Sequence, residues 1–381
     1  MLQGNAESGF FLPGLLPTPD RQAYYDPERQ AWQVFRYAEV QRVLTDYKTF
    51  TSQREGHLDP RETKPGTKSM TDLDPPEHRR MRTLLSQAFT PRSVERLEPR
   101  VVMHVQSLLD QVIDRGEMDI VEDFAVPLPL IIIMELLGVP QEYLAQMRSW
   151  SDTFISILHP DAGRAKYEMA VFFSSLIEQK RCEPQDDLIS ALLNAQVDGT
   201  HLSQEDMVNF CFLLLIAGNE TTRNLIGNAV LCFDRYPDAQ SEVRADPGLL
   251  PRAIEEVLRY LPPVIQFPRI AAIDTTIDGQ AVKAGQWINP WIFSANRDAG
   301  QFSDPQVFDI RRNPNRHLSF GSGIHHCMGA PLSRLEMRIA FQMLFERLAT
   351  ITYIPLEKPE KSVLKPLSGG AHHIPITFIR A

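Results

Sequence analysis

Cys327 lies at the boundary between a glycine-rich segment and a segment with helical periodicity. The segment before it reads Phe-Gly-Ser-Gly-Ile-His-His from Phe320, and apolar residues follow it at steps of three and four: Leu332, Leu335, Ile339 and Met343. This spacing predicts a helix that buries one face. Because the N–H groups at a helix start carry partial positive charge, we expect them to favour the thiolate and lower the pKa of Cys327.

A thiolate in this position suits a haem iron, which accepts sulfur as an axial ligand, while His325 can meet a haem carboxylate. The alternative is a buried structural cysteine on a tight turn. The segment Phe320 to Gly329 matches the signature Phe-Gly-x-Gly-x-His-x-Cys-x-Gly position for position, and so resembles the cytochrome P-450 family. That resemblance implies haem b bound by Phe320, His325, Cys327 and Gly329, with Cys327 as the iron ligand.

A second segment, from Ser203 to about Arg235, reads as one long helix. Ser203 and Asp206 have the spacing of a capping box, and the helix would be about 48 Å long at 1.5 Å per residue. The run from Phe210 to Ile216 is apolar on every side. That composition predicts a helix buried all round.

The apolar run ends in the sequence Ala-Gly-Asn-Glu-Thr-Thr, from Ala217 to Thr222. An acid here is costly unless it has a partner or a function. The alternative for the threonines is a hydrogen bond back to the preceding turn, which would bend the helix. The segment resembles the family's oxygen-activation motif, which implies that Gly218 leaves room beside the iron and that Glu220 and Thr221 relay protons to dioxygen.

Three more basic residues have counterparts in the family. His78 and Arg82 are four apart on a helix expected to run from Asp74 to about Phe89, so they share one face. Alone, such a pair is usually a solvated surface. The segment Asp-Pro-Pro-Glu-His-x-x-x-Arg resembles the family helix whose His and Arg bind the haem propionates, and Arg269 matches a third propionate contact.

Glu256 and Arg259 are three residues apart on a helix predicted from Pro251 to Leu261. Taken alone, such pairs are usually exposed and contribute little. Arg312 follows in the pattern Pro-x-x-Phe-Asp-x-x-Arg. Together the three resemble the family's Glu-Arg-Arg triad, which implies a buried network that locks the cysteine loop.

Composition restricts the broad class of protein. The chain has 381 residues, and its 43% hydrophobic content and mean hydropathy of -0.22 are ordinary for a soluble globular protein. Its net charge of -9 argues against a nucleic-acid partner. The four cysteines (182, 211, 232 and 327) are too scattered for a disulfide framework or a metal cluster, so we expect a cytoplasmic protein. The apolar patch near the N-terminus is too short for a membrane anchor.

The expected fold is mainly α with a smaller β region, in one domain spanning 1–381 with an irregular segment over about 1–20. In the P-450 fold that the resemblance implies, the haem lies between the long central helix and the cysteine loop and its helix. Strands are predicted at Trp32–Tyr37, between Asp274 and Phe293, and at the C-terminus, with an Asp278-Gly279 hairpin turn. Short helices are predicted at Ala38–Leu44 and Leu130–Leu137.

The resemblance implies a haem-thiolate monooxygenase that inserts one atom of O2 into an organic, largely apolar small molecule. Electrons must come from a separate ferredoxin or flavodoxin with its reductase, because no part of the chain offers a flavin or iron–sulfur site. We expect that partner to dock near Arg79, Arg80, Arg334 or Arg338. The alternatives are a peroxide-driven peroxygenase, a non-catalytic haem sensor or carrier, and a cofactor-free helical protein.

Substrate identity is not readable from the sequence. The segments expected to set it are Thr51–Asp72, interpreted as a flap, Trp150–Lys180, interpreted as two helices, Pro262–Phe267 and Leu367–Ala371. Val264, Ile265 and Phe267 are interpreted either as an apolar surface near the haem or as core.

Overall fold

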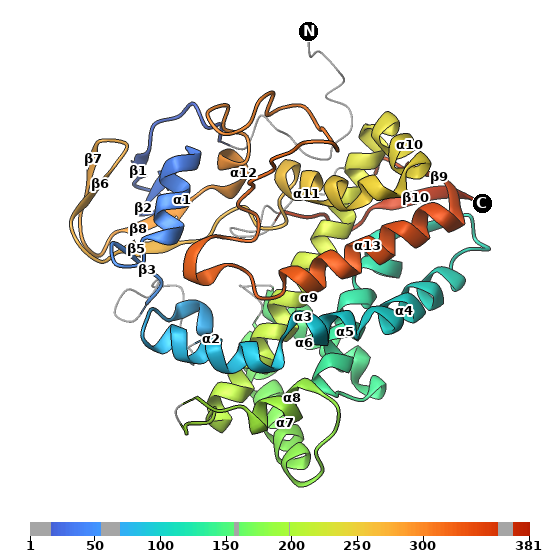
Figure 1. The fold of residues 1–381 in the computed structure, drawn as a ribbon, viewed down its shortest axis with the longest axis horizontal. Helices are drawn as coiled ribbons and strands as arrows, with labels where there is room; N and C mark the ends of the chain where they lie inside the picture. Colours follow the sequence, from blue (N-terminus) through green and yellow to red (C-terminus); the bar gives the residue numbers. More distant parts are fainter. Residues whose placement is uncertain (1–16, 55–68, 156–159, 198, 357–368) are drawn as a thin grey trace.

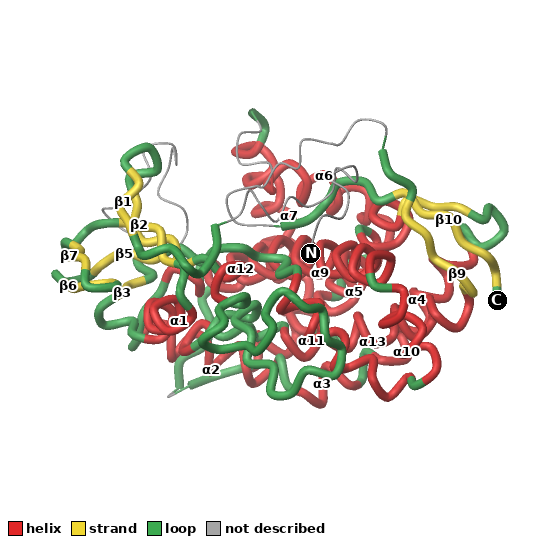
Figure 2. The backbone as a smooth tube through the Cα atoms, turned by 90° about the horizontal axis from the view of Figure 1, so that it is seen from above, coloured by secondary structure: helices red, strands yellow, loops and turns green. Residues whose placement is uncertain are grey.

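The computed structural model describes residues 17–54, 69–155, 160–197, 199–356 and 369–381. Helices dominate, as predicted, and they gather around one long helix, α9, which crosses the middle of the molecule (Figure 1). The strands lie at two opposite ends of the helical body (Figure 2). Most of the predicted flap lies outside the described residues, as do parts of two of the three other segments expected to contact substrate, 150–180 and 367–371.

The helices of the described chain are α1 Tyr37–Thr45, α2 Glu77–Ala88, α3 Pro91–Glu95, α4 Glu98–Asp110, α5 Pro127–Leu137, α6 Leu144–Ile155, α7 Ala162–Cys182, α8 Leu188–Asn194, α9 Gln204–Arg235, α10 Pro237–Ala245, α11 Leu250–Tyr260, α12 Ile292–Ala295 and α13 Ala330–Arg347. Single turns of 3-10 helix are η1 Met70–Asp72, η3 Gln141–Tyr143, η4 Pro247–Leu249 and η5 Gly323–His325, and η2 Ile120–Ala125 is a π-helix.

The strands are β1 Tyr24–Asp26, β2 Ala31–Val34, β3 Phe50–Thr51, β4 Glu117–Asp119, β5 Arg269–Ala271, β6 Thr275–Ile277, β7 Gln280–Val282, β8 Trp287–Pro290, β9 Leu348–Tyr353 and β10 Pro375–Arg380. One sheet has the order β1-β2-β8-β5-β3 and a second has the order β4-β10-β9. Strands β6 and β7 form a separate hairpin. Its turn is the predicted Asp278-Gly279, with φ of 51° and 77°, the left-handed geometry that such a turn needs.

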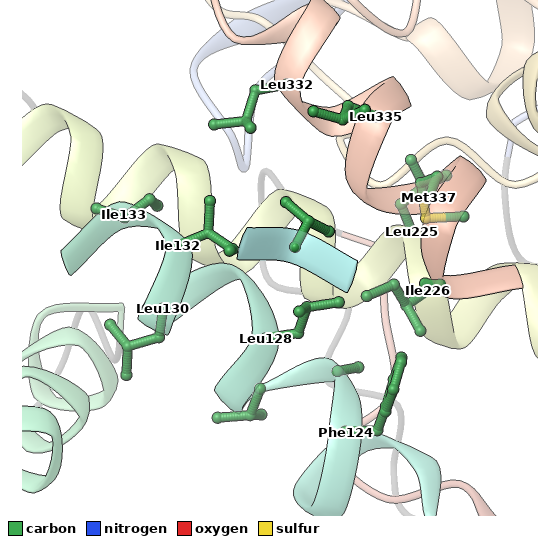
Figure 3. Close-up of a cluster of buried hydrophobic side chains, with 14 of the residues drawn as sticks. Phe124, Leu128, Leu130, Ile132, Ile133, Leu225, Ile226, Leu332, Leu335 and Met337 are labelled. Carbon is green, nitrogen blue, oxygen red and sulfur yellow. The ribbon is translucent and has the colours of Figure 1, made fainter. Parts of the chain in front are cut away.

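The core forms where α5, α9 and α13 meet. Figure 3 shows Leu128 and Ile132 of α5, Leu225 and Ile226 of α9 and Leu335 of α13 within one cluster of hydrophobic side chains, and all five are buried. A fully buried aliphatic side chain of this size contributes about 1.5–3 kcal/mol. This packing fixes α9 against α13, the helix that follows Cys327.

The start of α9 confirms the capping prediction. The Ser203 hydroxyl accepts a hydrogen bond from the N–H of Asp206 at 3.1 Å, and the Asp206 carboxylate accepts one from the N–H of Ser203 at 3.2 Å. The strand prediction at Trp32–Tyr37 was too long, because Tyr37 already belongs to α1. Its N–H donates to the Asp298 carboxylate at 2.8 Å, a cap supplied from far along the chain.

The prediction that α9 is buried all round from Phe210 to Ile216 was wrong. Phe212, Leu213, Leu214 and Ile216 are half-exposed, whereas Phe210 and Cys211 are buried. Farther along, Ala217 is exposed, although the helix lies in the middle of the molecule (Figure 1). One side of α9 is therefore accessible to solvent along this stretch. Within the described segments, no helix is both long enough and apolar enough to cross a lipid bilayer.

Candidate active site

The loop before Cys327 is held in a tight path against α1. Gly321 and Gly323 have φ of 71° and 69°, a left-handed conformation that favours glycine. A Cβ at Gly323 would lie 3.0 Å from the Cα of Thr45, so a side chain there would also collide with α1. The N–H of Cys327 donates to the carbonyl of Phe320 at 2.8 Å and closes the loop.

The Cys327 thiol sits at the start of α13, and the backbone N–H groups of Gly329 and Ala330 point toward it, as expected for a helix start. The expected lowering of its pKa was wrong: burial among protein atoms is the larger influence and raises the pKa of the thiol. The residue is nevertheless accessible to solvent. The N–H donors and the charges of Arg82 and Arg334 still favour the thiolate, and an iron ligand would use them.

Four basic side chains gather beside this loop. The rings of His78 and His325 lie 4.4 Å apart in an edge contact. Arg82 donates hydrogen bonds to the carbonyls of Ile324 at 3.0 Å and His326 at 2.7 Å, so it binds the loop directly. The Arg269 guanidinium is close enough to act on His325.

This cluster carries the electrostatic marks of an anion site. Burial, reinforced by the charges of Arg269, His78 and Arg82, lowers the pKa of His325 to about 3. Burial likewise lowers the pKa of Arg269 to about 10. The Nε2 atom of His78 is buried and has no hydrogen-bond partner. A buried ring nitrogen without a partner and two crowded arginines fit the carboxylates of a haem whose iron is bound by Cys327.

The predicted proton-relay residues lie together on α9. The Thr221 hydroxyl donates to the carbonyl of Ala217 at 2.7 Å. This is the hydrogen bond to the preceding turn that was the alternative interpretation of the threonines. Leu213, Ala217 and Thr221 are spaced by four and are at least partly exposed, so they share one solvent-accessible face, the open face of α9. Glu220 is half-buried beside them.

Gly218 has a packing role that the sequence did not reveal. A Cβ at this position would lie 2.5 Å from Cδ1 of Ile133, so the missing side chain lets α5 approach α9 closely. The neighbouring Asn219 is buried, and its Nδ2 donates to the Ser151 hydroxyl of α6 at 3.1 Å.

The three residues of the expected triad meet in the interior. Glu256 and Arg259 are 0% exposed and form a two-fold contact, with N–O distances of 2.8 and 2.7 Å. Nε of Arg312 lies 3.2 Å from the same carboxylate. Arg259 also donates to the carbonyls of Asn296, Pro305 and Val307 at 2.8–2.9 Å. The triad thus ties α11 to the long loop that leads toward Cys327.

A second acid on α11 holds the cysteine loop from another side, and the sequence analysis missed it. Glu255 binds Arg334 of α13 through two contacts of 2.7 and 2.8 Å and accepts from His317 at 3.1 Å. Although burial opposes the charged form, these partners lower the pKa of Glu255 to about 2. The guanidinium of Arg334 lies 4.5 Å from the ring centre of Phe320. The signal was available in principle, because Glu255 directly precedes the recognised Glu256.

The three apolar residues before β5, interpreted from the sequence either as a surface near the haem or as core, differ in burial. Ile265 is 2% exposed and belongs to the core, whereas Val264 and Phe267 are half-exposed. Across the described parts of the chain, no three His, Cys, Asp or Glu side chains gather in a way that could hold a metal ion. A thiol beside a cationic cluster suits an iron held in a macrocycle that carries carboxylates.

Comparisons with known proteins agree with the interpretation of this site as a haem site. The Cytochrome P450 family model matches residues 130–247 and 248–375. Cyclomarin C epoxidase CymV of Salinispora arenicola is 38% identical over 86% of this chain and 86% of its own length. Erythromycin C-12 hydroxylase of Saccharopolyspora erythraea is 36% identical over 98% and 96%.

A solved structure agrees in fold as well as in sequence. CYP109E1 from Bacillus megaterium in complex with testosterone superposes with a TM-score of 0.86 at 39% identity, covering 94% of this chain and 96% of that one. The thiol, the cationic cluster and the buried triad thus occur in a chain that is similar along nearly its whole length to these proteins. The chain belongs to the cytochrome P450 family, whose members bind haem.

Proposed function

We propose that this protein is a haem-thiolate monooxygenase that inserts one atom of O2 into an organic, largely apolar small molecule by hydroxylation or epoxidation. The observation that carries the proposal is the solvent-accessible Cys327 thiol at the start of α13, flanked by a cationic cluster with an unpartnered buried nitrogen on His78. The hydroxylase and epoxidase relatives support the reaction class.

Cys327 would be the iron ligand of haem b, and His78, Arg82, Arg269 and His325 would hold its carboxylates. When bound, haem b supplies dioxygen binding and O–O cleavage, which electron donation from a thiolate favours. Phe320 and Gly329 border the sulfur side. A Cβ at Gly329 would stand 3.8 Å from the sulfur.

On the opposite side, α9 supplies the groups that hold and move protons. Thr221 keeps its hydroxyl oxygen at the open face of the helix, anchored by its bond to Ala217. Glu220 can take protons from solvent and pass them on. One oxygen atom enters the substrate and the other leaves as water, which consumes two electrons and two protons, so a proton path is required.

The substrate would lie against the apolar open face of α9 and the segment before β5. Leu213, Val264 and Phe267 are half-exposed there, and apolar walls with few polar groups are typical of small-molecule sites. The steroid complex of CYP109E1 shows that a protein of this fold and similarity binds a compact apolar molecule.

Electrons would come from a ferredoxin or flavodoxin with its reductase, in the cytoplasm. All four cysteines are free thiols, which suits a reducing compartment. Of the arginines expected at the docking face, Arg334 and Arg338 are paired with Glu255 and Glu98 at 2.7 and 2.9 Å. Arg79 and Arg80 are exposed and remain the better candidates.

The test is reconstitution of the purified protein with a ferredoxin, its reductase and NADPH, using compounds first selected by a substrate-induced spin-state shift in the haem spectrum. We expect substrate-dependent oxygen consumption with a matching amount of oxygenated product. Turnover with peroxide but none with dioxygen and electrons would favour a peroxygenase. Haem binding and spin shifts without any turnover would favour a sensor or carrier.

A further inference from the structure

His78, Arg82, Arg269 and His325 form a basic cluster whose members come from separate parts of the chain. His78 and Arg82 lie on α2, Arg269 begins β5, and His325 precedes the cysteine. A residue that contacts several of these segments is therefore needed to hold the cluster together. The structure provides one in Asp74, a buried acid just before α2 that is 7% exposed.

Asp74 fixes the end of β3. The Thr51 hydroxyl donates to one carboxylate oxygen, and the N–H of Ser52 donates to the other at 3.2 Å. Strand β3 pairs with β5, with Thr51 opposite Ile270. The carbonyl of Asp74 accepts from the N–H of His78 at 3.0 Å, so the same residue also anchors the first turn of α2.

Ser52, which is bound by Asp74, also contacts the cysteine loop. Its side-chain oxygen lies 3.0 Å from Nε2 of His325, and the residue is only 5% exposed. The His325 ring also hydrogen-bonds the Leu73 backbone and meets the ring of His78 in an edge contact. The negative charge of Asp74 also acts on Arg269 and His78.

We propose that Asp74 and Ser52 are positioning residues for the haem: Asp74 clamps the end of β3 against α2, and Ser52 holds the imidazole of His325 in the orientation that meets a haem carboxylate. This inference rests on the proposed function. Ser52 orients His325 directly, and Asp74 acts through Ser52 and by partly balancing the positive charge of the cluster. Removing either should loosen the haem, and removing the charge of Asp74 should also alter the iron's reduction potential.

The test compares Ser52→Ala, Ser52→Thr and Asp74→Asn with the parent holoenzyme. The rate of haem release to excess apomyoglobin and the reduction potential from spectroelectrochemistry are measured. Loss of one side-chain hydrogen bond should speed haem release about five-fold in Ser52→Ala. Ser52→Thr, which keeps a hydroxyl, should restore slow release. Asp74→Asn should release haem about ten-fold faster and have a higher potential, since a negative charge near the haem is lost.

Ser190→Ala is the matched control, because Ser190 is a buried serine of α8 whose hydroxyl accepts one backbone hydrogen bond, at 2.9 Å from Gln185. It should match the parent in both measurements. Equal release from Ser52→Ala and the parent, or equal acceleration in Ser190→Ala, would overturn the inference while leaving the proposed function intact. If Asp74→Asn does not fold, Ser52→Ala and Ser52→Thr decide alone. A parent protein that binds no haem would instead contradict the proposed function.

Discussion

At the scale of single residues, burial and specific partners have opposite effects on the pKa of an ionisable group, and which effect is larger differs from site to site. Burial prevails at the Cys327 thiol despite the helix start, while hydrogen bonds and ion pairs prevail at Glu255. Glu336 of α13 is 2% exposed, its Oε2 has no partner, and burial raises its pKa from 4.5 to about 8. The protonation of Glu336 therefore affects the stability of the fold.

We expect Glu336→Gln to remove a pH dependence of folding. Between about pH 4.5 and pH 8 the folded protein keeps a proton on Glu336 that the unfolded chain releases, so the parent's stability falls as pH rises through this range. The variant should be more stable than the parent near pH 8 and equal to it in acid. Urea unfolding of the holoenzyme at several pH values measures this. The exposed Glu346→Gln of the same helix is the control, and parallel curves for parent and Glu336→Gln would refute the prediction.

Thr221 gives a prediction about coupling of oxygen use to product. In Thr221→Ala the hydroxyl at the open face of α9 is lost, so protons should arrive less efficiently and more oxygen should leave as peroxide. We expect continued oxygen consumption with a several-fold lower ratio of product to oxygen consumed. Thr221→Ser should restore the ratio, and Thr222→Val, at a buried neighbour that is 3% exposed, should leave it near the parent's. An unchanged ratio in Thr221→Ala would remove this threonine from the relay.

At the scale of elements, the buried triad joins α11 to the loop that ends at Cys327. Two adjacent arginines of this loop allow a buried ion pair to be compared with an exposed one. The Arg312 side chain is 7% exposed and binds Glu256, whereas Arg311 is 59% exposed and binds Glu242. Removing one partner of a buried pair costs about 3–5 kcal/mol. An exposed pair contributes about 0–1 kcal/mol.

Arg312→Ala should therefore lower the free energy of unfolding by about 3–5 kcal/mol, and Arg311→Ala by less than about 1 kcal/mol. Denaturant unfolding followed by circular dichroism and by haem absorption gives both values. Because the triad secures the cysteine loop, haem absorption should be lost at lower denaturant in Arg312→Ala. Similar losses in the two variants would mean that the triad does not stabilise the fold more than a surface pair.

Elements with strong local signals were predictable from sequence. The capping box at Ser203, the Asp278-Gly279 turn and the helix after Cys327 all formed as expected, because residues close in sequence determine them. The helix predicted at Ala38–Leu44 forms as α1 but begins one residue earlier, at Tyr37, where the N–H donates to the distant Asp298. In the site, motif residues could be placed, whereas Asp74, Ser52 and Glu255 gain their roles only from contacts with distant segments.

At the scale of the whole molecule, the chain carries a net charge of -9, yet its cysteine loop lies among Arg82, Arg269 and Arg334. The haem carboxylates and Glu255 would balance these three charges, so exposed cations near the loop are the ones that would orient an acidic redox protein. Exposed Arg79 and Arg80 lie on α2, the helix that binds this loop through Arg82.

Reversing both charges, in Arg79→Glu combined with Arg80→Glu, should slow reduction by a ferredoxin and weaken its dependence on salt. Stopped-flow reduction at several ionic strengths measures both effects. Arg164→Glu on α7, at a side chain that is 77% exposed, is the charge control and should match the parent. Unchanged rates and salt dependence in the double variant would exclude this part of the surface as the docking site.

The measurement that bears most directly on the whole account is the absorption spectrum of the reduced protein under carbon monoxide, for the parent and for Cys327→Ala. Ligation by the Cys327 sulfur predicts the red-shifted Soret band of a thiolate-bound carbonyl haem in the parent and its loss in the variant. Cys182→Ala, at an exposed thiol elsewhere, should keep the band. A parent without the red-shifted band, or a Cys327→Ala variant that retains it, would contradict the account.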